Sequence, residues 1–378
     1  MDFTEKSIQL TKALTKTEKK DNGIFFTPKT ARYHVFELLK KHKIKPKTIL
    51  EPSFGSGEFL DDLYVQYPKA KIVGVEKCKT LYDSVDRPNT QNIDFMEYSG
   101  THDLIIGNPP FVVIPKTDET LKCQGLRPNL FVQFIYNSLT KHLNKNGYLA
   151  FILPTAFFNC SYYEKARDYI FKNTTILEAV PLSCKYLETQ QDTFVLILKN
   201  IKLNDDYFVT INDKYYITPF YKELRELLVG SQTLKDLGFK VKTGEVVWNQ
   251  VKENLGDSGT LLIYSSNFKK GILEFPEMKA PKKQYVNDIK KTPLSGESIL
   301  INRGYGNSYS LTCVLVNFPE YYAENHVNVI RPVNTKISLD SILNSLKSKN
   351  TGLFIQYFIG NGALSKTEIE SCIPIWLI

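Results

Sequence analysis

The chain has 378 residues, of which 42% are hydrophobic and 23% are charged, and its formal net charge at pH 7 is +8. This composition is that of a globular protein and excludes disorder for the bulk of the chain. No apolar run reaches the roughly 18 residues of a membrane-spanning helix, and the first residues lack the apolar core of a secretory signal. The length suggests about two or three domains, and the positive charge is compatible with a polyanionic partner.

Short apolar strands alternate with helices over the first 200 residues. The hydrophobic pattern predicts strands at 48–50, 71–76, 104–106, 148–153 and 176–180. It predicts helices at 30–41, 58–67, 79–85, 130–143 and 162–171. This alternation is typical of a doubly wound α/β sheet with helices on both faces. Residues 193–198 and 207–211 are expected to pair with each other as antiparallel strands.

The alternation fades after about residue 225, where scattered strands and glycine-rich turns take over. We therefore predict two domains, an α/β domain over residues 1–228 and a mixed domain over residues 229–378. The six cysteines and five histidines show no ligand spacing and no Cys-x-x-Cys pair. We expect no metal site, no disulfide framework, and a reducing, intracellular and cytoplasmic location.

A glycine turn follows the first predicted strand directly. It reads Glu-Pro-Ser-Phe-Gly-Ser-Gly over residues 51–57, and a helix begins after it. Glycines allow a tight turn and let a ligand approach the start of the helix closely. Glu76 ends the next strand, where a carboxylate can accept hydrogen bonds from the two hydroxyls of a ribose. Glu51 is a candidate for the cationic end of the same ligand.

Asp94 and Phe95 follow where a third strand should end. A carboxylate beside an aromatic ring suits an adenine, because the acid can accept from the exocyclic amine while the ring stacks on the base. Taken alone, this pair is more typical of a polar loop residue followed by a core phenylalanine.

The most specific motif is Asn-Pro-Pro-Phe at residues 108–111, directly after the apolar strand 104–106. Consecutive prolines fix the backbone and remove two donors, so nearby carbonyl groups remain as acceptors. Together with the asparagine carbonyl they can accept both hydrogens of an exocyclic amine and aim its lone pair at a sulfonium methyl group. Such a transfer needs positioning and electrostatics, with no metal and no covalent intermediate.

The order of these motifs resembles the S-adenosylmethionine-dependent methyltransferases, and more narrowly the TaqI-like, gamma-class DNA adenine methyltransferases. The resemblance implies a seven-stranded, Rossmann-like class I methyltransferase sheet followed by a target-recognition domain. It implies that the catalytic motif is Asn108, Pro109, Pro110 and Phe111, although the family often has tyrosine at the last position. It implies cofactor contacts from Thr27, Glu51, Ser53, Phe54, Gly55, Gly57, Glu76, Asp94, Phe95 and Asn108.

Residues 236–378 resemble the target-recognition domains of these enzymes. From this we expect contacts with DNA from Arg303, Tyr305 and Asn307, and a second wall of the target-base site from Tyr186. The predicted activity is methylation of the N6 amine of an adenine flipped out of duplex DNA, with S-adenosyl-L-methionine as the methyl donor. Relatives of the TaqI type commonly read TCGA or a longer site that contains it, which makes TCGA the first candidate target.

Two alternatives remain open at this point. The same amino-group chemistry serves enzymes that methylate guanine in RNA or a glutamine of a release factor. The other alternative is a recognition module without activity, such as a specificity subunit, although the intact cofactor and catalytic motifs argue against it. The preferred interpretation is the modification half of a type II restriction–modification system, with a separate cognate endonuclease as a partner. We expect a monomer, because one copy of the recognition region is present and each strand can be methylated in turn.

Overall fold

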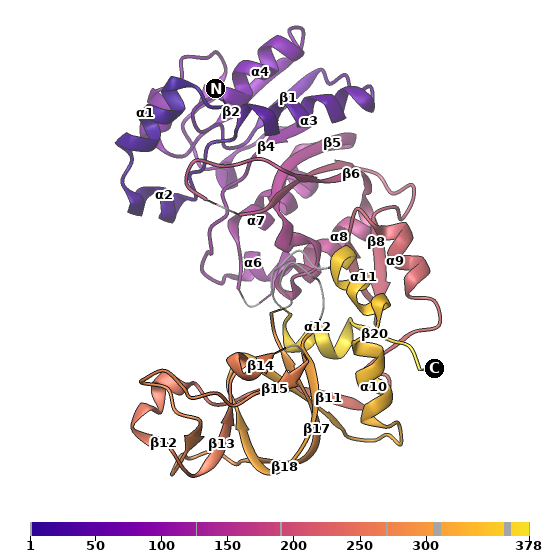
Figure 1. Cartoon of the computed structure of the whole chain (residues 1–378). Coiled ribbons are helices and arrows are strands. Elements are labelled where there is room, and N and C mark those ends of the chain that lie inside the picture. Colours follow the sequence, from indigo (N-terminus) through magenta and orange to yellow (C-terminus); the bar gives the residue numbers. More distant parts are fainter. Residues whose placement is uncertain are drawn as a thin grey trace. The chain divides into compact units, whose positions relative to one another are not determined.

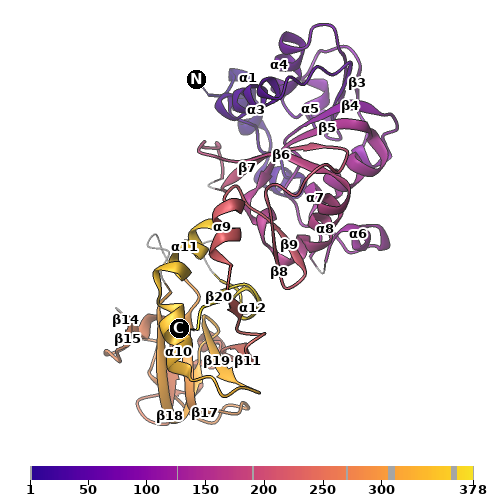
Figure 2. The ribbon, with the colours of Figure 1, turned by 90° about the vertical axis from the view of Figure 1, so that its right-hand side faces the viewer.

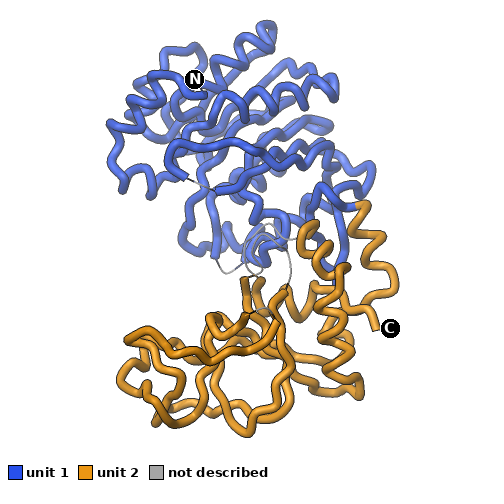
Figure 3. The backbone as a smooth tube through the Cα atoms, viewed as in Figure 1, with its two compact units in different colours: residues 1–221 blue, residues 222–378 orange. Residues whose placement is uncertain are grey.

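The computed structural model of the chain describes two compact units, residues 1–221 and residues 222–378 (Figure 3). Each is described by itself. The sequence places the division after residue 228, whereas the two units meet between residues 221 and 222. The structure describes residues 2–125, 127–189, 191–269, 271–304, 311–358 and 364–377.

The first unit is built on a seven-stranded sheet in the order β3-β2-β1-β4-β5-β7-β6. Figure 1 labels β1, β2, β4, β5 and β6 of this sheet. Strands β3, β2, β1, β4 and β5 pair in parallel, and β7 runs antiparallel between β5 and β6. The chain reverses its winding direction between β1 and β4, which is where ligands bind in open α/β sheets. The strands are β1 (Thr48–Glu51), β2 (Lys71–Val75), β3 (Thr90–Gln91), β4 (His102–Gly107), β5 (Leu143–Pro154), β6 (Thr175–Leu182) and β7 (Thr193–Lys199).

Helices cover both faces of this sheet, as the alternation of strands and helices predicts. One apolar cluster joins α3 (Lys29–Lys41) and α4 (Glu58–Gln66) to one face of the strands. Another joins α7 (Leu130–Asn137) and α8 (Glu164–Asn173) to the opposite face. Figure 2 shows the two helical layers on either side of the strands. The predicted doubly wound α/β fold class is therefore confirmed.

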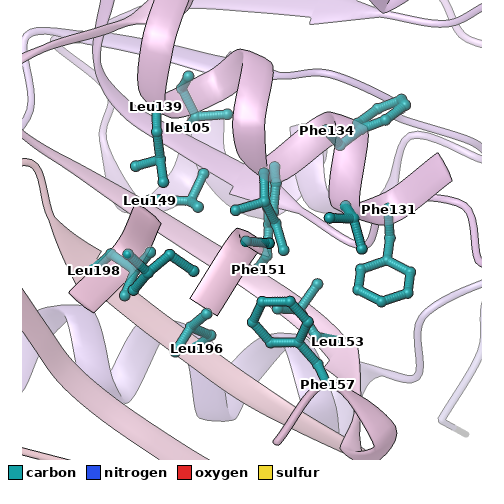
Figure 4. Packing of buried hydrophobic residues seen from close by; sticks show 14 of the residues in the cluster. Ile105, Phe131, Phe134, Leu139, Leu149, Phe151, Leu153, Phe157, Leu196 and Leu198 are labelled. Carbon is teal, nitrogen blue, oxygen red and sulfur yellow. The ribbon is translucent and has the colours of Figure 1, made fainter. Parts of the chain in front are cut away.

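The side-chain alternation of β4 and β5 explains why both faces need cover. Leu104 and Ile106 pack in the cluster of α3 and α4, whereas Ile105 packs in the cluster of α7 and α8. All three are fully buried. Figure 4 shows Ile105 near Leu149 and Leu139 in the second of these clusters. Burying a side chain of this size contributes about 1.5–3 kcal/mol, so these strands are stable only between two helical layers.

The expected pairing between residues 193–198 and 207–211 is wrong. Strand β7 instead lies between β5 and β6, and β8 (Phe208–Ile211) pairs with β9 (Lys214–Ile217). Both segments read as apolar strands, and a pattern of period two gives no information on the partner strand. A tight turn with positive φ at Asn212 and Asp213 joins β8 to β9, a local hairpin signal of the Asn-Asp type that outweighs the more distant pairing.

The remaining elements of the first unit are short helices. The N-terminal helices α1 (Glu5–Ala13) and α2 (Lys16–Asn22) begin at Thr4 and Thr15, whose side chains cap them. Thr4 and Ser7 also donate to the buried carboxylate of Glu58 at the start of α4, which fastens this N-terminal segment to the sheet domain. The others are α5 (Lys79–Asp83) and α6 (Asp118–Cys123), and α9 (Tyr221–Leu227) spans the boundary between the two units.

The second unit is a mixed α/β unit built on another seven-stranded sheet, in the order β11-β19-β17-β18-β13-β16-β12. Its strands are β11 (Phe239–Thr243), β12 (Leu255–Gly256), β13 (Thr260–Ile263), β16 (Tyr285–Val286), β17 (Leu294–Asn302), β18 (Cys313–Ala323) and β19 (Val327–Pro332). Two small pairs join β10 (Gln232–Thr233) to β20 (Pro374–Ile375) and β14 (Phe268–Lys269) to β15 (Ile272–Leu273). Its helices are α10 (Leu339–Leu346), α11 (Lys349–Phe358) and α12 (Lys366–Ser371).

Two kinds of feature are absent from the residues that the structure describes. None of the described helices combines the length and the apolar character that crossing a membrane requires. Within the same residues, no group of three or more His, Cys, Asp or Glu side chains is gathered where it could hold a metal ion.

Candidate active site

The carboxyl ends of β1, β2 and β4 meet where the winding direction reverses, and each carries a polar side chain. Glu51 is the last residue of β1, Glu76 follows β2, and Asn108 follows β4. The glycine turn bends around the same point because Gly55 adopts a φ of 58°, a value that favours glycine. The backbone N–H of Gly55 donates to Glu76 Oε2 at 2.9 Å, so the turn and the second strand are held together.

Backbone donors fix the orientation of the Glu76 carboxylate. Its Oε2 accepts from Gly55, and its Oε1 accepts from the backbone N–H of Cys78 at 2.8 Å. Burial raises the pKa of Glu76 above its ordinary value, and these two hydrogen bonds partly oppose that rise. A carboxylate can accept about four hydrogen bonds. The remaining lone pairs are therefore available to a pair of ligand hydroxyls.

Glu51 is a buried carboxylate with an unused acceptor. Its side chain is 1% exposed, and its Oε2 has no hydrogen-bond partner among the described residues. Desolvation raises the pKa of Glu51 well above its ordinary value, although the nearby Arg32 guanidinium lowers it in part. A buried carboxylate of this kind favours a cationic ligand, because pairing with a cation offsets the lost hydration. Glu51 borders a small cavity of about 40 Å³ together with Thr27, Arg32, Ser53, Phe54, Ser56, Glu58 and Asn108, among others.

A larger cavity of about 260 Å³ adjoins the same turn. It is lined by residues of the N-terminal segment, the glycine turn, the ends of β2 and β4 and the start of α7; they include Asn22, Gly23, Phe25, Phe26, Pro52, Ser53, Gly55, Glu76, Lys77, Cys78, Leu81, Asp94, Phe95, Asn108, Pro110, Leu130 and Phe134. We call it the cofactor cavity. Asp94 accepts from the backbone N–H of Met96 and pairs with Lys77 at 2.9 Å, and Phe95 lies 4.7 Å from the ring of Phe134.

The hydrogen-bond acceptors of these two cavities fit a nucleoside that carries an amino-acid tail. Glu76 offers acceptors for ribose hydroxyls, Asp94 offers one for an exocyclic amine, and Glu51 offers one for an ammonium group. An apolar side, with Phe26, Leu81 and Phe134, can cover the planar base. The unpartnered Oε2 of Glu51 is the strongest structural sign of this fit, because buried acceptors without partners are rare in native structures.

Asn108 lies at the junction of the cofactor cavity and a second one. Its Nδ2 donates to Thr27 Oγ1 at 3.1 Å and to the backbone carbonyl of Phe25 at 3.4 Å. A backbone carbonyl can only accept, so the nitrogen faces Phe25 and the oxygen faces away. That Oδ1 atom is buried and has no partner among the described residues. The amide therefore presents a free, fixed acceptor.

The second cavity has a volume of about 180 Å³ and shares Phe25 and Asn108 with the first. We call it the target cavity. Its other lining residues are Lys20, Phe111, Tyr186, Thr189, Gln191 and Thr193. The ring of Phe111 meets Phe131 edge-on at 5.8 Å, and Tyr186 Oη lies 3.0 Å from Thr193 Oγ1. Burial raises the pKa of the Tyr186 phenol, which stays protonated and can hydrogen-bond in either direction.

Contacts between distant segments hold the walls of the target cavity together. Lys19 is 9% exposed, and its Nζ pairs with Glu188 at 2.6 Å and donates to the carbonyl of Thr11 at 2.8 Å. Gly23, with a φ of 63°, packs so closely on the Asn-Pro-Pro-Phe segment that an added Cβ would lie 3.0 Å from Pro110 Cβ. The N-terminal segment is therefore part of both cavities.

The structure brings most of the proposed site residues together. Thr27, Glu51, Ser53, Phe54, Gly55, Glu76, Asp94, Phe95, Asn108 and Pro110 line the small cavity or the cofactor cavity, and Phe111 and Tyr186 line the target cavity. Pro109 is buried between its two neighbours. Gly57 starts α4 with a φ of 84° and packs against Val85. Arg303 lies in the second unit, where its Nε donates to the carbonyl of Leu364 at 3.3 Å, and Tyr305 and Asn307 lie outside the described residues.

Sequence reasoning missed several residues that line the cavities. Phe25 lies two residues before Thr27 and borders both cavities, and Lys20 lies in α2, whose lysine-rich sequence carries no motif. Gln191 and Thr193 carry no motif, and they reach the site only because β7 inserts between β5 and β6. Of these residues, only Phe25 could have been found from the sequence, through its position close to Thr27.

Comparison with known proteins places these features in a family context. The model of the Eco57I restriction-modification methylase family matches residues 2–186. The type II methyltransferase M.CvrRI of Paramecium bursaria Chlorella virus XZ-6E is 31% identical over 99% of both chains. The modification methylase CviBIII of Paramecium bursaria Chlorella virus NC1A is 29% identical over 99% of both chains. The type II methyltransferase M.BsuBI of Bacillus subtilis is 23% identical over 93% of this chain and 87% of its own.

Proposed function

The chain belongs to the type II DNA methyltransferases of restriction–modification systems, which use S-adenosyl-L-methionine, and from this premise we propose that it methylates the N6 amine of adenine in a short duplex target. The observation that carries the proposal is the unpartnered Oδ1 of Asn108, a residue that lines both the cofactor cavity and the target cavity. Membership of this family favours DNA over the RNA guanine and release-factor glutamine alternatives.

The exocyclic amine of adenine is a poor nucleophile because its lone pair is delocalised into the ring. Asn108 Oδ1 can accept one of its hydrogens, and the rigid Pro109–Pro110 backbone leaves carbonyl groups nearby that can accept the other. Two acceptors in fixed positions localise the lone pair and direct it toward the cofactor cavity. Positioning and electrostatic stabilisation of this kind are the main sources of catalysis we infer here.

When bound, S-adenosyl-L-methionine supplies an electrophilic methyl group on a sulfonium centre. Glu76 and Asp94 would bind its nucleoside part, and the buried Glu51 carboxylate would pair with its ammonium group. Glu51 is ionised in that pair, and because desolvation raises its pKa in the empty cavity, pairing with the ammonium group favours loss of a proton from this carboxyl group as pH falls toward that pKa. Binding of the cofactor is therefore expected to release a proton.

The target cavity suits a flipped base. Phe111, held edge-on by Phe131, offers a flat face for stacking, which contributes about 1–3 kcal/mol per base in proteins that bind unpaired nucleic acid. That is comparable to the few kcal/mol needed to take a base out of the duplex stack. The Tyr186–Thr193 hydroxyl pair can bond to ring nitrogens of the base.

The remaining roles follow from the same proposal. We assign catalysis to residues 1–228 and target recognition to residues 229–378, with Arg303, Tyr305 and Asn307 as candidate DNA contacts. We expect a monomer that acts inside the cell on one strand at a time, beside a separate cognate endonuclease. TCGA, or a site that contains it, is the proposed target.

The test is transfer of a labelled methyl group to unmethylated duplex DNA, followed by digestion to nucleosides. N6-methyladenine is the expected product, and Asn108→Ala should slow its formation about 100- to 1,000-fold. A methylated cytosine amine would contradict the adenine assignment. Transfer to RNA or to a release factor, with none to DNA, would overturn the proposal.

Long-read mapping of modified adenines on the same DNA tests the target. Modification confined to sites that contain TCGA is the expected result. A different short sequence would reject TCGA while leaving the proposed reaction intact.

A further inference from the structure

The orientation of the Asn108 amide needs an explanation, because its two ends have nearly the same shape. Only hydrogen bonds distinguish the oxygen from the nitrogen. If the amide turned over, its nitrogen would face the target cavity and repel the amine that it should bind. Some neighbouring group must therefore hold the nitrogen on the other side.

The carbonyl of Phe25 can only accept and so decides which end of the amide is the nitrogen, whereas the Thr27 hydroxyl adds the shorter contact and fixes the position of the amide. Thr27 Oγ1 accepts from Asn108 Nδ2 at 3.1 Å, whereas the carbonyl of Phe25 accepts at a marginal 3.4 Å. A hydrogen bond between N and O is most favourable near 2.9–3.0 Å, so the Thr27 contact is the stronger of the two. Thr27 is only 7% exposed, which limits competition from water for its hydrogen bond with Asn108.

Thr27 is itself held in place from behind. Arg32 Nη1 donates to the backbone carbonyl of Thr27 at 2.6 Å, and the same guanidinium pairs with Glu58 at 2.6 Å and with Asp62 at 2.7 Å. Arg32 and Glu58 are both 5% exposed. A charged network that is buried and hydrogen-bonded at this level fixes the position of its members. The backbone of Thr27, which carries the hydroxyl, is thus anchored.

We infer that Thr27 is a positioning residue for catalysis, whose hydroxyl accepts from Asn108 Nδ2 and fixes the amide in the place from which Oδ1 can accept from the target amine. This inference rests on the proposed function and deepens it. It also separates Thr27 from the cofactor-binding role that the family resemblance implies, because a group that acts through Asn108 should affect methyl transfer and not cofactor affinity.

The experiment compares Thr27→Val, which keeps the shape and removes the acceptor, with Thr27→Ser, which keeps the acceptor. Single-turnover methylation by Thr27→Val should fall about 10- to 100-fold, as expected for a misplaced catalytic group. Dissociation constants for S-adenosylmethionine and for target DNA should stay within about threefold. Thr27→Ser should retain the wild-type rate within about threefold. Thr30→Val, at the exposed start of α3, is the matched control.

A second measurement separates positioning from general damage to the fold. In an Asn108→Ala background, Thr27→Val should cause no further loss, because residues that act as a unit are not additive. A rate for Thr27→Val within threefold of wild type overturns the inference, as does a loss of cofactor affinity equal to the loss of rate. If the wild-type protein is active and Thr27→Val is unaffected, this inference alone is rejected. If the wild-type protein modifies no adenine, the proposed function is rejected and the inference with it.

Discussion

The two cavities that meet at Asn108 differ in the chemistry of their linings. The cofactor cavity and the small cavity beside it present the carboxylates of Glu51, Glu76 and Asp94. The target cavity has no carboxylate among its described lining residues, which are aromatic, amide, hydroxyl and lysine side chains. Under the proposed function, charge would recognise the cofactor, whereas stacking and hydrogen bonds would recognise the target base. Substitutions on either side should therefore have separable effects.

The largest effect is expected where the two cavities meet. Asn108→Ala removes the free acceptor and should lower the single-turnover rate about 100- to 1,000-fold, the usual loss when one oriented polar group is removed from a transition-state site. Affinities for cofactor and DNA should change little. Rapid-quench kinetics measures the rate, with Asn173→Ala on the exposed end of α8 as the control. A variant that retains more than a tenth of the rate would contradict the central role of Asn108.

The next effect isolates the target side. Phe111→Ala removes the stacking face and should weaken productive DNA binding about 5- to 100-fold, because base–aromatic stacking contributes about 1–3 kcal/mol. Phe111→Tyr preserves the ring and should stay within about threefold of wild type. Fluorescence of 2-aminopurine at the target position reports the unstacked base. Equal effects of the two substitutions would show that the ring does not stack on the target.

A smaller effect, with a pH dependence, isolates the cofactor side. Cofactor binding needs ionised Glu51, whose pKa in the empty cavity is raised well above its ordinary value by desolvation. As pH falls through that raised pKa, the affinity should fall by up to about tenfold per pH unit, and above it the affinity should level off. Calorimetry in buffers of different ionisation enthalpy should detect the released proton. Glu51→Gln should bind the cofactor about tenfold more weakly at neutral pH and lose the pH dependence, whereas Glu97→Gln, at an exposed site, should behave as wild type.

The same substitution should change stability in the opposite direction. A carboxyl group whose pKa is raised in the folded state favours folding at low pH, and this contribution is lost as pH rises. Glutamine does not ionise, so Glu51→Gln removes this loss of folding stability with rising pH, and the cofactor-free protein should melt about 2–4 °C higher at neutral pH. Differential scanning fluorimetry without cofactor measures the shift. A lower melting temperature would show that Glu51 stabilises the empty fold.

The smallest effect concerns the hydroxyl pair of the target cavity. Tyr186→Phe removes one hydroxyl of the contact with Thr193 and should reduce the rate about two- to fivefold, the usual size of a single neutral hydrogen bond. Thr193→Val should cause a similar loss, and the double variant should lose little more than either one. Full additivity in a double-mutant cycle would show that the two hydroxyls act independently.

The two cavities also differ in how well the sequence predicts them. Glu51, Gly55 and Glu76 lie at strand ends that follow one another in the chain, so local pattern and strand order are enough to bring them together. The wall of the target cavity comes from Lys20, Phe25 and residues 186–193, which meet only through the tertiary fold. The insertion of β7 between β5 and β6 depends on strand pairing over a long separation, and the apolar pattern of β7 does not encode its partner. Only the family resemblance predicts a role for Tyr186.

The central claim is that Asn108 Oδ1 accepts the amine of an adenine held in the target cavity. The most direct test is a crystal structure of the protein with a non-reactive cofactor analogue and a duplex that contains the mapped target. This structure should show an adenine outside the duplex stack, with its N6 atom about 2.7–3.2 Å from Asn108 Oδ1 and its ring parallel to that of Phe111. An adenine amine bound elsewhere, or a different group against Asn108 Oδ1, would contradict the claim.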